Sequence, residues 1–99
     1  IDLYDPEIDA LRWSYAAGDA MSKIPEWAQT GGLKPGQAVA GTAFAEQRPA
    51  RTDDYLADER LIRDDLARSF VEESGIRSVI AVPLEGDGAP LGTLSVVSR

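Results

Sequence analysis

Adjacent carboxylates are the residues best suited by type to acid–base catalysis or to metal binding. Pairs of this kind are Asp53–Asp54, Asp64–Asp65 and Glu72–Glu73. Neighbouring residues of a helix point in different directions, and Asp64 stands four residues before Arg68, at the spacing of a helical ion pair. The pairs therefore indicate a solvated helix face rather than a catalytic or metal site.

The other reactive groups do not form a complete catalytic motif. Gly36 and Gly41 have the glycine spacing of a phosphate-binding P-loop, but Thr42-Ala43 follows where that motif needs lysine and a hydroxyl residue. A serine or threonine nucleophile needs a base, and without histidine only Lys23, Lys34 or a carboxylate is left. Neither lysine lies in an apolar run that would lower its pKa. We therefore expect no enzyme activity within this stretch.

Composition narrows the range of partners. The 99 residues include no cysteine and no histidine, which excludes disulfides, thiolate catalysis and the usual zinc and haem ligands from this stretch. The net charge of −7 and the pI near 4.4 argue against nucleic acid or an anionic membrane as a partner, because phosphate contacts need clustered cations. No apolar run approaches the roughly 18 residues of a membrane span, and no signal peptide is recognisable. We expect a cytoplasmic domain that contacts neither nucleic acid nor membrane.

The first half of the chain alternates between strand and helix patterns. Residues 1–4 and 11–15 alternate apolar and polar side chains around a turn, which predicts a hairpin with Leu11, Trp13 and Tyr15 on one face. We expect a short helix over Asp19–Trp27. A second helix is expected over Gln37–Gln47, whose small residues would allow close packing on a sheet. Residues 48–53 should be extended and lie near a sheet edge, because of Pro49.

The second half contains the most regular helix and two apolar strands. Asp54–Ser74 repeats Ile62, Leu66 and Phe70 every four residues, with Ala67 and Val71 alongside, which predicts a helix with this apolar stripe toward the core. Leu56–Glu59 could instead form a separate turn. Gly75 suits the C-terminal cap of the helix. A strand follows over residues 76–84, apolar on both faces and so interior. A hairpin loop over 85–90 and a β-branched strand over 91–98 complete the pattern.

These elements predict an α+β fold, a mostly antiparallel sheet with helices on both faces. We expect a single domain over residues 1–99. The chain begins at Ile1 rather than methionine, and both ends fall in or beside predicted strands. We therefore expect an excerpt of a longer polypeptide and an incomplete domain.

Four sequence blocks in fixed order resemble the GAF domain family. The blocks are LKPGQAVAG (33–41), RPARTDD (48–54), GIRSVIAVPL (75–84) and PLGTLSV (90–96). Each is weak alone, but their order and spacing, with a helix between the second and third, are specific. The chain looks most like GAF sensor modules of bacterial, actinobacterial-type histidine kinases.

The resemblance implies a sheet of about six antiparallel strands in the full domain, helices on both faces, and a small-molecule pocket between the sheet and the loops. It also implies that an N-terminal helix, a last strand and a C-terminal helix lie outside the excerpt. Terminal helices commonly mediate dimerisation in the family, so a homodimer through helices outside the excerpt is expected.

Several branches of the family do not fit. Haem-binding members need an axial ligand, usually histidine, and bilin-binding members attach their chromophore to cysteine, so we expect neither cofactor. Free methionine sulfoxide reductases of this fold also need cysteines. Cyclic-nucleotide-binding members carry an Asn-Lys…Phe…Asp-Glu signature, whereas this chain has no asparagine and its Asp58-Glu59 precedes Phe70. The expected ligand is an unknown small molecule.

Five residues are candidates for binding it: Phe44, Asp54, Tyr55, Phe70 and Arg77. The three aromatic residues lie near the loop–helix side where the family's pockets sit, although core packing is the favoured role of Phe44 and Phe70. Asp54 could instead cap the helix that follows. Arg77 is the cation best placed to face a pocket anion, the alternative being extension into solvent.

The predicted function is a regulatory, small-molecule-binding domain of a bacterial signal-transduction protein, most simply a two-component sensor histidine kinase. One alternative is a ligand-free module for dimerisation and signal relay. Another is the sensor domain of a transcription regulator or a phosphatase.

Overall fold

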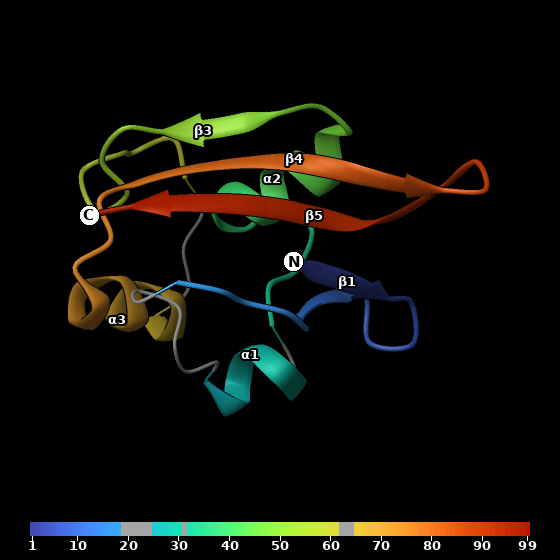
Figure 1. Cartoon of the computed structure of the whole chain (residues 1–99), viewed down its shortest axis with the longest axis horizontal. Coiled ribbons are helices and arrows are strands. Elements are labelled where there is room, and N and C mark those ends of the chain that lie inside the picture. Colours follow the sequence, from blue (N-terminus) through green and yellow to red (C-terminus); the bar gives the residue numbers. More distant parts are fainter. Residues whose placement is uncertain (19–24, 31, 62–64) are drawn as a thin grey trace.

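The computed structural model describes residues 1–18, 25–30, 32–61 and 65–99. They form one sheet and three helices (Figure 1). The strands are β1 (Asp2–Asp5), β2 (Ala10–Trp13), β3 (Ala50–Thr52), β4 (Ser78–Gly86) and β5 (Ala89–Ser98). The helices are α1 (Glu26–Thr30), α2 (Ala38–Glu46) and α3 (Asp65–Ser74). The sheet order is β2-β1-β5-β4-β3 with every pairing antiparallel, which confirms the predicted fold class.

Two hairpins build most of the sheet, as predicted. In the first, Asp2 pairs with Trp13 and Tyr4 with Leu11. In the second, the strands continue further than expected, because the turn is only Asp87-Gly88. Both turn residues have positive φ, 50° and 79°, which is the geometry that an Asp-Gly hairpin turn favours. β4 is interior and β3 is at the edge, as the sequence predicts.

The two hairpins meet over a very short distance. β1 pairs with β5 only through Asp2–Thr93 and Leu3–Gly92. A Cβ atom on Gly92 would lie 2.0 Å from the carbonyl oxygen of Asp2, so this crossing needs glycine. Beyond Thr93, no described strand lies along that side of β5. The sheet therefore opens into a gap between β5 and the first hairpin.

Helix α2 packs against the sheet through small residues, as predicted. Ala38, Ala40 and Ala43 are buried, and a Cβ atom on Gly41 would lie 2.5 Å from the carbonyl oxygen of Lys34. Val39 of this helix and Leu11 of β2 belong to the same core. Phe44, also on α2, stacks on Tyr4 of β1.

The prediction for α3 is wrong in two respects. The helix begins at Asp65 instead of Asp54, and residues 53–61 form turns, in line with the separate turn considered for Leu56–Glu59. The side chain of Asp58 accepts hydrogen bonds from the backbone N–H of Arg60 and from the Thr52 hydroxyl, and such bonds compete with helix formation.

The buried face of α3 matches only part of the predicted stripe. Ala67 and Val71 are buried, whereas Leu66 is 55% exposed. Phe70 is half-buried, and Ile62 lies outside the described residues. The helix therefore turns the 67/71 side toward the sheet, about 100° from Leu66.

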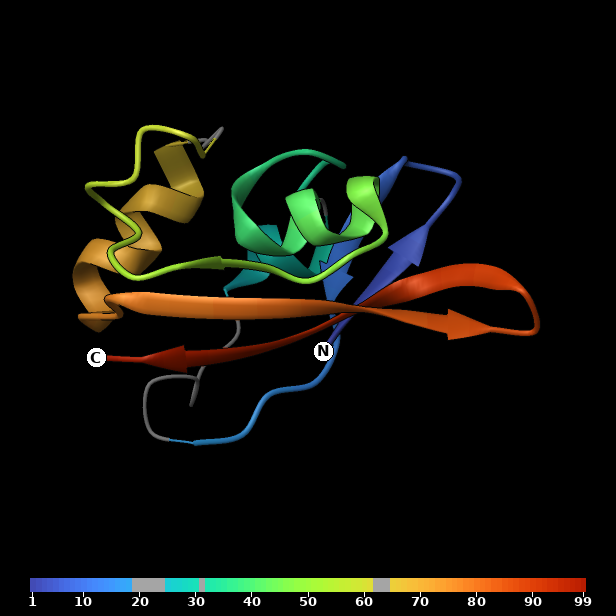
Figure 2. The ribbon, with the colours of Figure 1, turned by 90° about the horizontal axis from the view of Figure 1, so that it is seen from above.

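The described helices lie on one side of the sheet (Figure 2). The expectation of helices on both faces is therefore not met by the described residues. On the other face Ile80 pairs with Val96, and both are exposed, as is Leu94. The helix expected over Asp19–Trp27 begins only at Glu26, and residues 19–24 lie outside the described ranges. None of the described helices is long and apolar enough to cross a membrane.

Candidate ligand-binding pocket

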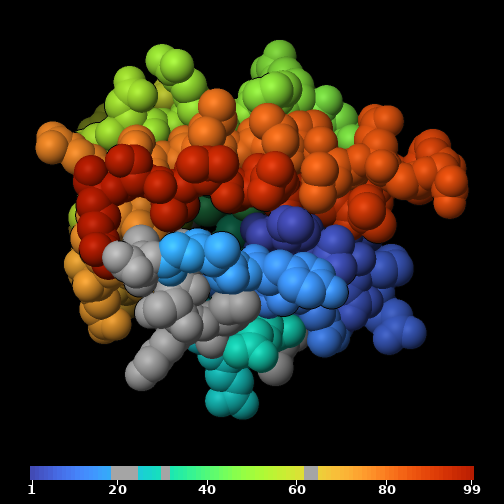
Figure 3. Space-filling model, viewed as in Figure 1, coloured from blue at the N-terminus to red at the C-terminus, as the bar shows by residue number. Residues whose placement is uncertain are grey.

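The gap between β5 and the first hairpin holds a cavity of about 500 Å³. Figure 3 shows it as a hollow between the red β5 and the light-blue chain after β2, with the green of α2 at its base. Its walls come from the helices α1, α2 and α3, from the strands β1, β2, β4 and β5, and from the chain around them. The opening follows directly from the short β1–β5 pairing.

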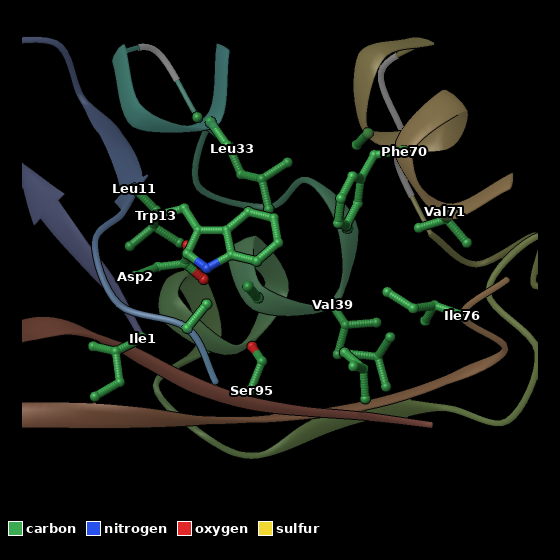
Figure 4. Close-up of a pocket in the computed structure, with 18 of the residues that line it drawn as sticks. Ile1, Asp2, Leu11, Trp13, Leu33, Val39, Phe70, Val71, Ile76 and Ser95 are labelled. Atoms are coloured by element: carbon green, nitrogen blue, oxygen red, sulfur yellow. The ribbon is translucent and has the colours of Figure 1, made fainter. Parts of the chain in front are cut away.

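Aromatic rings form one wall of the cavity. Trp13 on β2 meets Phe70 on α3 edge to face, with ring centroids 5.1 Å apart and planes at 85° (Figure 4). Trp27 on α1 and the buried Tyr55 also line the cavity. The sequence places these four rings far apart, and the fold brings them around one space.

The remainder of the lining is mostly aliphatic. Val39 and the alanines of α2 line the cavity on the side of that helix, and Val71 and Ile76 close the end beside α3 (Figure 4). Val79 of β4 also lines the cavity. Because alanine stops at Cβ, α2 can lie close to the sheet and still leave space above it. A cavity with these walls excludes charged groups unless they find partners.

A polar corner interrupts this apolar lining. Trp13, Asp2 and Thr93 are successive cross-strand partners, so their side chains share one face of the sheet, and Ser95 follows two residues along β5 on that face. The Thr93 hydroxyl donates to Asp2 Oδ2 at 3.4 Å. Burial raises the pKa of the Asp2 carboxyl. Ser95 Oγ is buried and has no hydrogen-bond partner in the described structure.

The structure separates the five residues predicted to bind a ligand. Tyr55 and Phe70 line the cavity, whereas Phe44 lies in the core against Tyr4. The other two lie outside the lining. Arg77 is 72% exposed at its side chain and has its Nε 3.8 Å from Asp54 Oδ2.

Asp54 has a local structural role in addition to this ion pair. Its Oδ1 accepts a hydrogen bond from the backbone N–H of Ala57 at 3.3 Å, which caps a turn. Arg77 contributes through its backbone, because its carbonyl accepts a bond from the N–H of Tyr55 at 2.8 Å. The cation predicted to face a pocket anion therefore positions Tyr55 instead.

Asp58 fixes the chain that carries Tyr55. Its carboxylate accepts bonds from Arg60 Nε at 2.9 Å, from the second Arg60 nitrogen at 2.7 Å, and from the Thr52 hydroxyl at 2.7 Å. Arg60 first, and then Thr52, hold the pKa of Asp58 well below its usual range. Residues 52–60 are thereby tied to the end of β3.

Reasoning from sequence missed the polar corner. Asp2 stands in an alternating run that suggests an outward polar residue, and Ser95 is an unremarkable serine in a β-branched strand. From the sequence, core packing is the favoured role of Trp13, and a place in the pocket is the alternative. Their common position depends on the pairing of β1 with both β2 and β5, which no local pattern reveals.

The polar corner has no features of a metal centre. In the part of the chain that the structure describes, no three Asp, Glu, His or Cys side chains come together to hold an ion. The cavity is therefore suited by its lining to an organic molecule.

Comparisons with known proteins agree with this fold. A family model described as "GAF domain" matches residues 3–99. A solved structure of free methionine-R-sulfoxide reductase from Neisseria meningitidis, in complex with its substrate, is similar with 26% sequence identity and a TM-score of 0.65. The similarity covers 98% of this chain and 48% of that one, so this chain spans about half the length of the reductase. No curated protein sequence gives a match.

Proposed function

This chain belongs to the GAF domain family, and on that premise we propose that it is a regulatory domain that binds a small molecule between β5, α2 and α3. The observation that carries this proposal is the cavity itself. A volume of about 500 Å³, apolar walls and a few convergent polar groups are typical of small-molecule sites.

Binding without catalysis is the second part of the proposal. The similar structure is a reductase by name, and it holds its substrate. This chain has no cysteine to supply the thiols that such reductases need. Among the described residues of the lining, no histidine, cysteine or lysine stands beside Ser95 to activate its hydroxyl as a nucleophile. We therefore expect the ligand to leave the domain unchanged.

The third part concerns the protein that contains this chain. We propose a cytoplasmic sensor histidine kinase of a bacterial two-component system, dimerised through helices outside these residues. The support is the resemblance of the four sequence blocks to kinase sensor modules. The test is ATP-dependent phosphorylation of a histidine in the full-length protein, and its absence would favour a transcription regulator or a phosphatase.

Thermal unfolding tests ligand binding directly. A molecule that binds only the folded state raises the melting temperature, by an amount that grows with the logarithm of its concentration once this exceeds the dissociation constant. We expect 2-phenylethanol to raise the melting temperature of the chain, and Ser95→Leu to abolish the effect by filling the cavity. Ser98→Leu is the matched control, because it places the same side chain on the opposite face of β5. If the domain is a relay module without a ligand, 2-phenylethanol will not shift the melting temperature of the wild type or of either variant.

A further inference from the structure

The charge of the cavity lining points to a particular kind of ligand. Asp2 is the only residue with a charged side chain among the described residues that line it. The α-amino group of Ile1 lies nearby, but it donates to the Tyr15 carbonyl at 2.8 Å. Arg77, the cation suggested by the sequence, lies outside the lining and beside Asp54. With a net charge of −7 over the whole chain, this arrangement attracts cations and repels anions.

We propose that the pocket binds a small amine, with an aromatic or aliphatic body against Trp13, Trp27 and Phe70 and a protonated amino group between Asp2 and Ser95. This inference rests on the proposed small-molecule-binding function and adds the chemical class of the ligand.

Two polar groups of the lining call for hydrogen-bond donors. Ser95 Oγ has no partner in the described structure, and a buried hydroxyl without a partner is unfavourable. Among the described residues, the hydrogen bond to the Asp2 carboxylate is the long one from Thr93. Burial raises the pKa of this carboxyl, against the opposing effects of the Ile1 α-amino group and of Thr93. An ammonium group has three N–H donors and can serve both oxygens. Figure 4 shows Ser95 directed from β5 into the cavity and Asp2 beside the Trp13 indole.

The aromatic wall fits the same ligand. A cation near the face of tryptophan is attracted by the electrons of the ring, and the attraction grows when water is excluded. Trp13 is the cross-strand partner of Asp2, so one side of the ligand's amino group would meet the carboxylate and the other the indole. A carboxylate ligand would meet Asp2 with like charge and find no lysine or arginine side chain among the described residues of the lining.

Three probes with one body and different head groups test this inference. They are phenethylamine, 2-phenylethanol and phenylacetate, titrated calorimetrically into the protein. We expect phenethylamine to bind about tenfold more tightly than 2-phenylethanol, as a hydrogen bond to a charged group predicts, and phenylacetate to bind weakest.

Variants connect the preference to named atoms. Asp2→Asn should reduce the affinity for phenethylamine to about that for 2-phenylethanol. Ser95→Ala should reduce the affinity for phenethylamine more than the affinity for phenylacetate. Asp87→Asn removes the same charge from an exposed turn and should leave all three affinities unchanged. Ser95→Ala decides the question if Asp2→Asn fails to fold.

The outcomes separate the two proposals. If 2-phenylethanol binds and the amine binds no more tightly, or if phenylacetate binds best, the amine inference is wrong while the small-molecule function stands. An amine preference that survives both Asp2→Asn and Ser95→Ala also overturns the inference. If none of the three binds, both proposals fail.

Discussion

Individual side chains decide which molecules this cavity can accept. Phe70 and Tyr55 form its walls by packing, but Asp2 and Ser95 are polar groups in a space that otherwise favours apolar atoms. Such groups reduce stability unless a partner compensates for the lost water. Their presence in the lining is the residue-level observation that best supports the proposal of a ligand.

Asp58 makes stability sensitive to acid. Since its folded-state pKa lies below the ordinary value of 3.8, its bonds stabilise the fold above that pH and are lost as the pH falls toward the folded-state pKa. We expect the melting temperature to fall as the pH drops below about 4, and Asp58→Asn to weaken this dependence. Melting curves over a pH series would measure it. Asp87→Asn is the control, and an equal response of the two variants would contradict the assignment.

The absence of histidine and cysteine predicts a colourless protein. Haem needs an axial ligand, usually histidine, and a bilin needs a thioether bond to cysteine. This stretch contains neither histidine nor cysteine. We expect the purified domain to show only the near-ultraviolet band of its two tryptophans and three tyrosines. An absorption spectrum after dialysis checks this. A visible band assigned to groups held by residues 1–99 would overturn the expectation of a colourless ligand held without a covalent bond.

Among the helices, α3 gives the sharpest test of how the cavity end is built. Val71 is buried against the cavity and Leu66 is more than half exposed. Val71→Ala should lower the free energy of unfolding by about 1–3 kcal/mol, whereas Leu66→Ala should change it by less than about 0.5 kcal/mol. Denaturant unfolding of both variants measures the difference. The reverse order would mean that α3 is rotated from the described position.

Among the strands, the short pairing of β1 with β5 determines where the gap begins. A methyl group on Gly92 would collide with the backbone of Asp2, so Gly92→Ala should cost more than about 1 kcal/mol of stability. Gly86→Ala is the matched control on the same hairpin, because its Cβ would meet only the Leu91 side chain, at 3.7 Å. Thermal unfolding compares the two. Equal stabilities would show that β1 does not cross at Gly92.

The sheet and its hairpins are predictable from sequence because strand patterns and turn residues are local. Asp87-Gly88 and the apolar runs on either side of it specify the β4–β5 hairpin without reference to the rest of the chain. The start of α3 is not predictable in this way. Asp58 lies in a segment predicted to be helical, but its side chain accepts a hydrogen bond from Thr52 on β3, which favours a turn there. Periodicity also misassigns Leu66, because the buried face depends on what the helix meets.

The cavity is harder still to predict, because it lies where elements fail to meet. It exists because β1 pairs with β5 at only two positions and α2 has small side chains. Tyr55 and Phe70 are candidates from the sequence because they are aromatic, and both line the cavity. Phe44 is a candidate for the same reason, but it packs in the core. Position along the chain could not place Arg77 outside the lining or Asp2 within it.

Ligand binding in this gap is the central claim, and the two tryptophans of the chain report on it directly because both line the cavity. Incorporation of fluorotryptophan gives one fluorine resonance each for Trp13 and Trp27. On titration with 2-phenylethanol we expect both resonances to move saturably with one dissociation constant, and neither to move in Ser95→Leu. Resonances that stay fixed in the folded protein, or that move alike in the wild type and in Ser95→Leu, would contradict a ligand site between β5 and the first hairpin.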